Sequence, residues 1–270
     1  MILQFYKYHG AGNDFIIIDL YKQTIELSND QVAFLCDRHF GIGADGLMLI
    51  KPHGEFDFEM VYYNSDGIPA TMCGNGGRCI ASFALKMGYI HNETTFLASD
   101  GVHTAKILEP HLIKLKMNDV MDVEIFEDGF FINTGSPHFV TYNYSLNNLN
   151  VNETGKKIRY EERFGKGGTN VNFCQPESDF KLRIRTYERG VENETLACGT
   201  GSVASAIAYC LNKEDGTYQV ELKALGGNLF VNLTKSGKTF TNIWLSGPAI
   251  FVFEGTIKMR PLQGNKLLTY

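Results

Sequence analysis

Two stretches decide how this chain folds: Met72-Cys73-Gly74-Asn75-Gly76-Gly77 and Ala197-Cys198-Gly199-Thr200-Gly201-Ser202. Each joins a cysteine to a glycine-rich turn and then to a run of small apolar residues, a pattern that predicts the start of a buried helix. The first N–H groups of a helix have no acceptor inside the helix and lie at its positive end, so they bind anions and lower the pKa of a nearby thiol. The pattern therefore predicts two acid–base thiols directed at one anionic substrate.

The two stretches belong to a longer internal repeat. Three pairs of segments match in the same order along the chain: residues 12–17 with 135–140, residues 38–43 with 162–167, and residues 72–77 with 197–202. Their offsets are 123 (135 − 12), 124 (162 − 38) and 125 (197 − 72) residues. A repeat of this length predicts two whole domains related by a pseudo-twofold axis, and ligand sites favour the interface between such domains.

Composition points to a small-molecule partner. The 270 residues are 44% hydrophobic, enough for two ordinary cores, and the net charge is −5. No Lys/Arg cluster forms an electrostatic footprint for nucleic acid or a membrane surface. Because the sequence has neither a signal-peptide pattern nor an apolar run of membrane-spanning length, we expect a cytoplasmic protein.

The cysteines divide into two groups. In the cytoplasm all six are expected to be reduced, and no Cys-x-x-Cys or His-x-x-x-His spacing predicts a metal site. Four of them lie among apolar residues and are expected to pack as small hydrophobes: Cys36, Cys79, Cys174 and Cys210. Cys73 and Cys198 differ because both stand in the duplicated glycine-rich context.

Hydrophobic alternation and short β-branched or aromatic runs predict many strands. They cover residues 3–8, 15–20, 47–50, 56–63, 94–98, 102–107, 112–116, 218–222, 228–233 and 240–245. A capping box at Ser28 starts a helix to about Arg38, two longer helices are expected over residues 73–87 and 198–211, and residues 142–152 are expected to form a surface loop or the approach to a helix. The predicted fold class is α+β, with two pseudo-twofold-related domains, each a curled, mostly antiparallel sheet around a central helix.

Two thiols across a pseudo-twofold axis can invert a carbon atom. Inversion removes a hydrogen from one face and delivers one to the other, so it requires an acid–base group on each side. We expect one thiolate and one thiol that exchange roles with the stereoisomer bound. The substrate α-carboxylate would lie between the two helix N-termini, held by amides of Gly74, Asn75, Gly199 and Thr200. This chemistry requires neither pyridoxal nor a metal, so no cofactor is expected.

At this point the motifs resemble the diaminopimelate epimerase family along essentially the whole chain. The matching segments are residues 9–15, 38–45, 64–67, 72–79, 135–138, 188–190 and 197–201. The resemblance implies cofactor-independent interconversion of LL- and meso-diaminopimelate, in lysine and peptidoglycan biosynthesis, by a homodimer. It also implies one domain of residues 1–117 that includes the C-terminal tail 254–270, and a second domain of residues 118–253.

Several site residues are carried over from that resemblance. Cys73 and Cys198 are the acid–base thiols, and His138 and Glu188 match positions that tune their pKa values. The substrate-binding positions are Asn13, Asn64, Asn170, Glu188 and Arg189, in addition to the four loop residues named above. Arg189 is the expected bidentate partner of the distal carboxylate, and Glu188 faces an ammonium group.

The sequence departs from the family pattern at three places. Gly46 stands where many members have a substrate-contacting glutamine, Ser136 replaces a common asparagine, and residues 191–194 include one extra residue. These departures concern how the amino and distal groups of the substrate are held. They leave the acid–base pair intact.

Other interpretations remain open at the level of sequence. A two-cysteine racemase acting on proline or hydroxyproline would share the architecture, and so would a non-catalytic thiol sensor or binding module of duplicated fold. Glu188 and Arg189 could form a surface ion pair, and His138 could cap a strand or fill a gap in a core.

Overall fold

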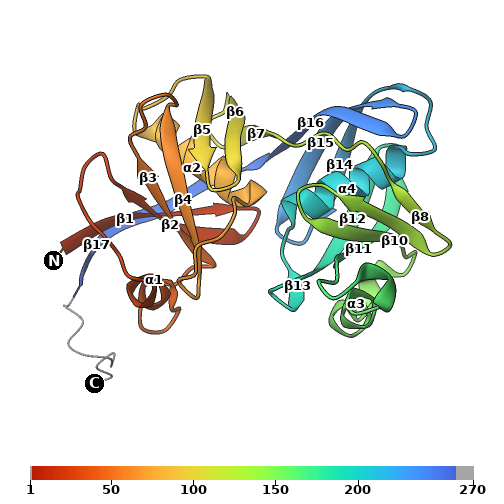
Figure 1. The fold of residues 1–270 in the computed structure, drawn as a ribbon, viewed down its shortest axis with the longest axis horizontal. Helices are drawn as coiled ribbons and strands as arrows, with labels where there is room; N and C mark the ends of the chain where they lie inside the picture. The colour runs from red at the N-terminus through yellow and green to blue at the C-terminus, as the bar shows by residue number, and fades with distance from the viewer. Residues whose placement is uncertain (1, 260–270) are drawn as a thin grey trace.

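The computed structural model describes residues 2–259, which form two lobes lying side by side (Figure 1). The first lobe contains β1 (Ile2–Gly10), β2 (Asn13–Asp19), α1 (Asn29–Cys36), β3 (Gly46–Lys51), β4 (Phe58–Asn64), α2 (Gly74–Lys86), β5 (Glu93–Ala98), β6 (Gly101–Glu109) and β7 (Leu112–Lys116). The second contains β8 (Glu124–Phe126), β9 (Gly129–Asn133), β10 (Pro137–Tyr142), η1 (Leu146–Asn148), α3 (Val151–Arg159), η2 (Glu162–Phe164), β11 (Asn170–Ser178), β12 (Lys181–Glu188), β13 (Asn193–Thr195), α4 (Gly199–Cys210), β14 (Gly216–Ala224), β15 (Gly227–Ser236) and β16 (Thr239–Pro248). The chain then returns to the first lobe as β17 (Ile250–Lys258), which pairs with β1.

The same succession of strand pairings occurs in both lobes. In the first, β1–β2 and β3–β4 are antiparallel, while β2–β3 and β4–β5 are parallel and enclose α1 and α2 between them along the chain. In the second, β9–β10 and β11–β12 are antiparallel, while β10–β11 and β12–β14 are parallel and enclose α3 and α4. Antiparallel pairs β5–β6–β7 and β14–β15–β16 complete each sheet. The predicted α+β class, with two related halves and mostly antiparallel sheets, is confirmed.

The central helices are buried because their side chains are small. Every residue of α2 from Gly74 to Ala84 is buried, and so is every residue of α4 except Thr200 and Tyr209, which are partly exposed. One apolar cluster includes residues of both helices and of both sheets, whereas two smaller clusters lie under α1 and α3. Strand β7 pairs antiparallel with β16, so the two sheets are also joined by hydrogen bonds.

The start of α2 lies directly against the start of α4. A Cβ built on Gly199 would lie 3.6 Å from Gly74 Cα and 2.9 Å from Leu245 Cδ2. A Cβ at position 199 would thus touch Gly74 Cα at van der Waals distance and would displace the tip of the Leu245 side chain. The glycine after each cysteine leaves the two N-termini in close contact.

The structure corrects several element boundaries. The helix that starts at the Ser28 capping box ends at Cys36 rather than near Arg38, because Asp37 is extended. The stretch 142–152 holds a 3-10 turn and the start of α3, whose N-cap is Asn150. The strands β8 to β13 and β17 were not predicted, and the return strand begins at Ile250, ahead of the expected tail at 254. Residues 260–270 of that tail lie outside the described residues. Between residues 2 and 259, no helix combines the length and apolar character needed to cross a membrane.

Candidate active site

The two predicted thiols stand at the N-caps of the central helices, on either side of the Gly74–Gly199 contact. Cys73 caps α2 in an extended conformation, and its Sγ accepts a hydrogen bond from the Gly76 amide at 3.2 Å. Cys198 occupies the matching position on α4 and is 8% exposed. The next amides of both helices lie in the first turn, where N–H groups have no acceptor within the helix. The two positive helix ends therefore converge beside both sulfur atoms.

Asparagines connect the Cys73 side to the second lobe. Asn13 Oδ1 lies 3.9 Å from Cys73 Sγ and accepts a hydrogen bond from Asn75 Nδ2 at 3.2 Å. The same Asn75 amide nitrogen donates to the backbone carbonyl of Ala197, the residue before Cys198, at 3.2 Å. Asn75 thus ties the two cysteine turns together.

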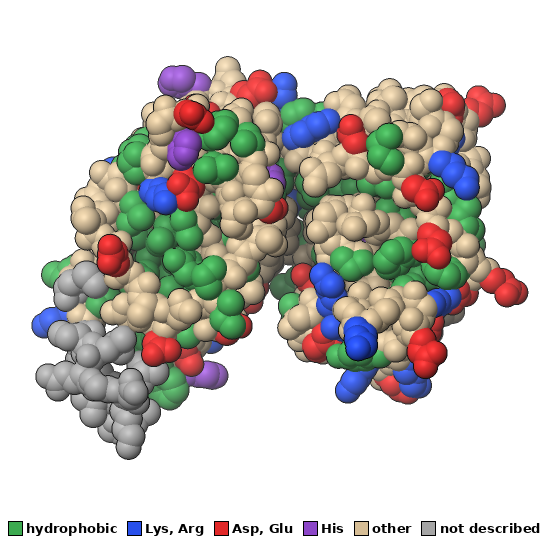
Figure 2. All heavy atoms as spheres, in the orientation of Figure 1, with side chains coloured by type: hydrophobic (Ala, Val, Ile, Leu, Met, Phe, Trp, Pro, Cys, Tyr) green, Lys and Arg blue, Asp and Glu red, His purple; other side chains and the backbone are tan. Residues whose placement is uncertain are grey.

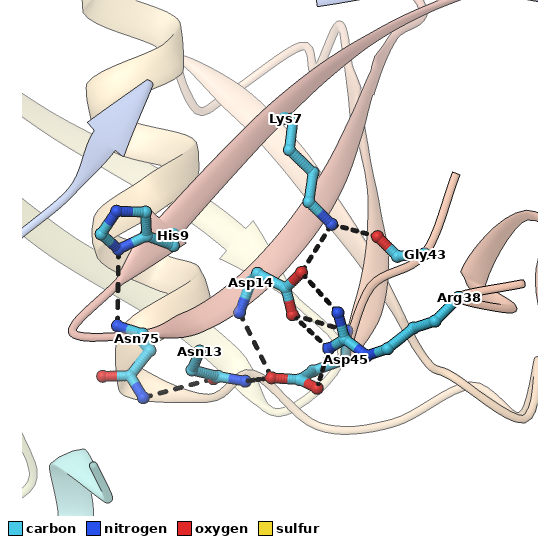
Figure 3. Close-up of polar contacts among 9 residues, drawn as sticks. Lys7, His9, Asn13, Asp14, Arg38, Gly43, Asp45 and Asn75 are labelled. Carbon is cyan, nitrogen blue, oxygen red and sulfur yellow. Dashed lines mark hydrogen bonds and ion pairs between the residues drawn. The ribbon is translucent and has the colours of Figure 1, made fainter. Parts of the chain in front are cut away.

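A network of charged side chains holds Asn13 in place (Figure 3). Asn13 Nδ2 donates to Asp45 Oδ2 at 2.7 Å, and Arg38 bridges Asp45 and Asp14 with contacts of 2.7 Å to each. Lys7 pairs with Asp14 at 2.7 Å and also donates to the Gly43 carbonyl. Burial opposes ionisation of Asp14, but the hydrogen bonds from Arg38 and Lys7 outweigh it and lower its pKa to about 2. The network holds the Asn13 side chain through its Nδ2 atom and leaves its Oδ1 atom facing Cys73.

On the Cys198 side, a chain of hydrogen bonds ends at the sulfur. Thr200 Oγ1 lies 3.5 Å from Cys198 Sγ and 2.9 Å from His138 Nε2. Asn172 Nδ2 is 3.0 Å from His138 Nδ1, and Asn172 Oδ1 accepts from Thr186. Because the Asn172 amide donates to Nδ1, the neutral ring carries its proton on Nε2 and donates it to Thr200. The Thr200 hydroxyl is then left to donate to the sulfur.

The His138 ring is neutral in this structure: it donates a hydrogen bond through Nε2 and does not take up a second proton. Its side chain is completely buried, and burial together with the nearby Arg189 charge lowers its pKa to about 3. Both ring nitrogens have hydrogen-bond partners, so this buried histidine also forms part of the chain that leads to Thr200. Thr200, predicted only for its amide, and Asn172, not predicted, both belong to this chain. The alternation of Asn170 and Asn172 in an otherwise apolar strand was the available signal.

Asn170 holds the loop that carries Arg189. Its Oδ1 accepts from the Arg189 backbone amide at 2.8 Å, and its Nδ2 donates to Ser136 Oγ at 3.0 Å and to the Pro137 carbonyl at 2.9 Å. The same loop is fastened by Glu192, which accepts hydrogen bonds from Arg159 and from the Gly190 amide. The extra residue noted in the sequence therefore falls in a well-bonded turn.

Arg189 is exposed, and its guanidinium forms no ion pair within residues 2–259. Glu188 instead accepts a hydrogen bond from Thr195 Oγ1 at 2.9 Å. The surface ion pair considered for Glu188 and Arg189 is therefore absent from this part of the chain. Both groups remain available to a ligand.

The expectation of a lowered thiol pKa is wrong for the substrate-free protein. Burial raises the pKa of Cys73 to about 11, the Gly76 amide opposes this shift, and the Glu188 carboxylate adds to it. Burial and Glu188 also raise the pKa of Cys198, against the Thr200 hydroxyl. Burial raises the pKa of Glu188 itself. The resting site therefore holds two neutral thiols, because desolvation outweighs the helix amides.

A buried guanidinium lies behind the two helix starts. The Arg78 side chain is inaccessible to solvent, donates to the Gly74 carbonyl at 3.2 Å and to Asn75 Oδ1 at 2.7 Å, and has no carboxylate partner among residues 2–259. Its Nε has no hydrogen-bond partner in this range. Sequence reasoning did not single out this residue.

Asn64 is a predicted substrate-binding residue whose side chain has no protein partner within residues 2–259. It is exposed at the end of β4, opposite Gly46 on β3, and its side chain makes no hydrogen bond to the described residues. The other four cysteines are buried free thiols, as expected. Within residues 2–259, no group of three or more His, Cys, Asp or Glu side chains is arranged to hold a metal ion.

Comparison with known proteins defines first the fold and then the family. In solved structures, a phenazine biosynthesis protein of the PhzF family from Bacillus anthracis superposes with a TM-score of 0.76 at 15% identity, covering 96% of this chain and 100% of that one. A hydroxyproline epimerase from Agrobacterium vitis superposes with a TM-score of 0.67 at 14% identity, covering 95% and 91%. At these identities the likeness shows the fold alone.

Sequence comparison is more specific. The family model for diaminopimelate epimerase matches residues 5–122 and 130–252. The diaminopimelate epimerase of Flavobacterium psychrophilum is 49% identical over 94% of this chain and 100% of the relative. The chain therefore belongs to the diaminopimelate epimerase family, and it is an isomerase of lysine biosynthesis with diaminopimelate epimerase function. This result decides against the proline racemase and the thiol sensor.

Proposed function

We propose that Cys73 and Cys198 epimerise diaminopimelate by a two-base mechanism that needs no cofactor. The observation that carries the proposal is the meeting of two cysteine-capped helix N-termini, one from each half of the repeat. A substrate α-carbon between the two sulfurs would have one thiol on each face. One thiolate would remove the α-hydrogen, and the opposite thiol would protonate the resulting carbanion.

The helix ends supply the electrostatic part of the mechanism. We assign the α-carboxylate to the amides of Gly74, Asn75, Gly199 and Thr200, which lie in the two first turns. Negative charge spreads into this carboxylate as the α-carbon loses its proton. Fixed N–H dipoles in a dry site stabilise such charge without reorganising.

The neutral resting thiols imply that the substrate takes part in their activation. Diaminopimelate brings two ammonium groups to a site where Glu188 has no cationic partner among the described residues. A nearby positive charge favours the thiolate. We propose that Glu188 faces an ammonium group, that Arg189 binds the distal carboxylate with its planar fork, and that Asn13, Asn64 and Asn170 complete or support these contacts. His138 and Glu188 would tune the thiol pKa values, His138 through Thr200.

The proposal extends to organisation and location. We divide the chain into residues 1–117 with the tail 254–270 and residues 118–253, and the pairing of β17 with β1 supports the return of the tail. We propose a homodimer in the cytoplasm, where the two thiols stay reduced. Sedimentation of the purified protein tests the oligomeric state.

Hydrogen exchange at the α-carbon tests the mechanism. In deuterated water, each stereoisomer should first yield inverted product that carries deuterium, because each face has its own proton donor. Cys73→Ala and Cys198→Ala should each abolish epimerisation, whereas Cys79→Ala, which removes another buried thiol of the same helix, should not. Equal early labelling of recovered substrate and product would indicate one base and refute the proposal.

A further inference from the structure

The side chain of Tyr62 fills the space beside Gly46. A Cβ built on Gly46 would lie 2.5 Å from Tyr62 Cε2 and 2.8 Å from Tyr62 Oη. The two residues lie on neighbouring strands, where Gly46 is opposite Asn64 and Tyr62 is opposite Met48. A side chain at position 46 and the ring of Tyr62 therefore exclude each other.

The strand β4 directs this ring toward the thiol side of the sheet. Phe58 and Met60 pack in the core around α2, and Tyr62 packs against the same cluster. A Cβ on Gly76, in the first turn of α2, would lie 3.5 Å from Met60 Cε and 3.3 Å from Cys73 Sγ. Because side chains alternate along a strand, Tyr62 continues the face of Met60 toward the end of β4 that carries Asn64. Tyr63 lies on the opposite face, in the core under α1.

The hydroxyl of Tyr62 makes no hydrogen bond to residues 2–259, although the ring is half-buried. Burial raises the pKa of Tyr62, and the Cys73 thiol, Asp45 and Glu188 add to the shift, so the phenol stays protonated. Asp45 belongs to the first lobe and already bonds Arg38 and Asn13. Glu188 belongs to the second and has no cationic partner among the described residues. The hydroxyl thus lies beside Gly46, the residue that follows Asp45, and no described residue occupies it with a hydrogen bond.

We propose that Tyr62 contacts the substrate, its phenol oxygen accepting a hydrogen bond from an ammonium group of diaminopimelate. This inference rests on the proposed function and deepens it. A phenol both accepts and donates hydrogen bonds, and an ammonium group is the donor that the neighbouring carboxylates attract. The residue that excludes a side chain at position 46 would then itself supply a polar contact in that region.

The test compares Tyr62→Phe with Tyr63→Phe, a change of the same atom on the next residue and the opposite face. Tyr62→Phe should raise KM for diaminopimelate about tenfold with kcat within about twofold, since a contact made equally to bound substrate and transition state affects binding alone. Tyr63→Phe should leave both constants at their wild-type values. The melting temperature of Tyr62→Phe should also match the wild type, because the lost hydroxyl has no partner in the described protein.

A second substrate identifies the ammonium group involved. This substrate is 2-aminopimelate, which has one amino group where diaminopimelate has two. When its α-hydrogen exchanges, the amino group is at the reacting carbon and the distal carbon has none. If Tyr62→Phe slows this exchange as much as that of diaminopimelate, the contact is to the α-ammonium; if it affects diaminopimelate alone, the contact is to the distal ammonium. Either result supports the proposal.

The proposal is overturned if Tyr62→Phe matches the wild type with both substrates, if Tyr63→Phe shows the same loss, or if Tyr62→Phe unfolds at a lower temperature and thereby reveals a structural role. The wild-type protein in the same assay separates this inference from the proposed function. Absence of α-hydrogen exchange in the wild type would refute the two-base mechanism. Exchange in the wild type with an unaffected Tyr62→Phe would refute only the role of Tyr62.

Discussion

Replacing Thr200 by valine tests the hydrogen-bond chain that ends at Cys198. Valine keeps the shape of threonine but removes the hydroxyl that lies 3.5 Å from Cys198 Sγ and 2.9 Å from His138 Nε2. The backbone amide, assigned to the substrate carboxylate, remains in place. The substitution therefore separates the hydroxyl from the helix N-terminus.

The magnitude follows from the change in charge at sulfur. The hydroxyl interacts weakly with a thiol, but a hydrogen bond to a charged group contributes about 1.5–3 kcal/mol. At about 1.36 kcal/mol per pKa unit, its loss raises the pKa of Cys198 by roughly one to two units. Because this pKa is already raised by burial, the thiolate is a minor form at neutral pH, and its population falls by about 10- to 100-fold. We expect kcat/KM to fall by the same factor in both directions, since the equilibrium constant does not change.

The assay is the pH dependence of kcat/KM for LL- and meso-diaminopimelate. The rising limb, which reports formation of a thiolate, should move to higher pH in Thr200→Val and return toward its original position in Thr200→Ser, which restores a hydroxyl. Thr134→Val is the matched control, because the Thr134 hydroxyl donates to the Thr200 backbone carbonyl at 3.0 Å and not to the sulfur. An unchanged limb in a folded Thr200→Val protein would refute the chain, as would an equal shift in Thr134→Val.

Three further predictions concern neighbouring groups. The folded protein holds the pKa of His138 at about 3 against an ordinary 6.5, so the unfolded chain binds a proton that the folded state refuses, and stability is lost as pH falls below about 6.5. Between pH 7 and 5 this costs about 2 kcal/mol, and calorimetry should find a smaller loss in His138→Gln; an equal loss would show that His138 does not titrate in this way. Arg189→Lys keeps the charge but loses the planar fork, so steady-state kinetics should give a kcat/KM at least tenfold lower, and an unchanged value would remove Arg189 from the site. Aerobic storage should link Cys73 to Cys198, reversibly and faster as pH rises, because thiolate is the reactive form; peptide mapping that finds the two unlinked in inactive protein would contradict this.

The sequence predicted what periodicity and local chemistry control. The duplicated cysteine turns fixed the two central helices to within one residue at each end, because the cap, the small residues and the stop are all local signals. The strands β8 to β13 were not predicted. Among them, β10 and β11 pair across the intervening α3, and that distant pairing decides their burial. The same limit applies to the site. Asn172, Thr200 and Tyr62 gain their positions from contacts between strands and helices far apart in the chain.

The hydrogen-bond environments of the two thiols differ although their helices are duplicated. Cys73 accepts the Gly76 amide and lies near the Asn13 carbonyl, which is held by ionic contacts, whereas Cys198 is more deeply buried and adjoins a hydroxyl oriented by a neutral histidine. The more accessible Cys73 should therefore ionise first, while Cys198 depends on Thr200 to become a base. Two-base inversion needs one acid–base group on each face of the carbon, and the two groups here differ in their hydrogen bonds and burial. The repeat supplies two acid–base positions, and the departures from its symmetry set when each one carries the proton.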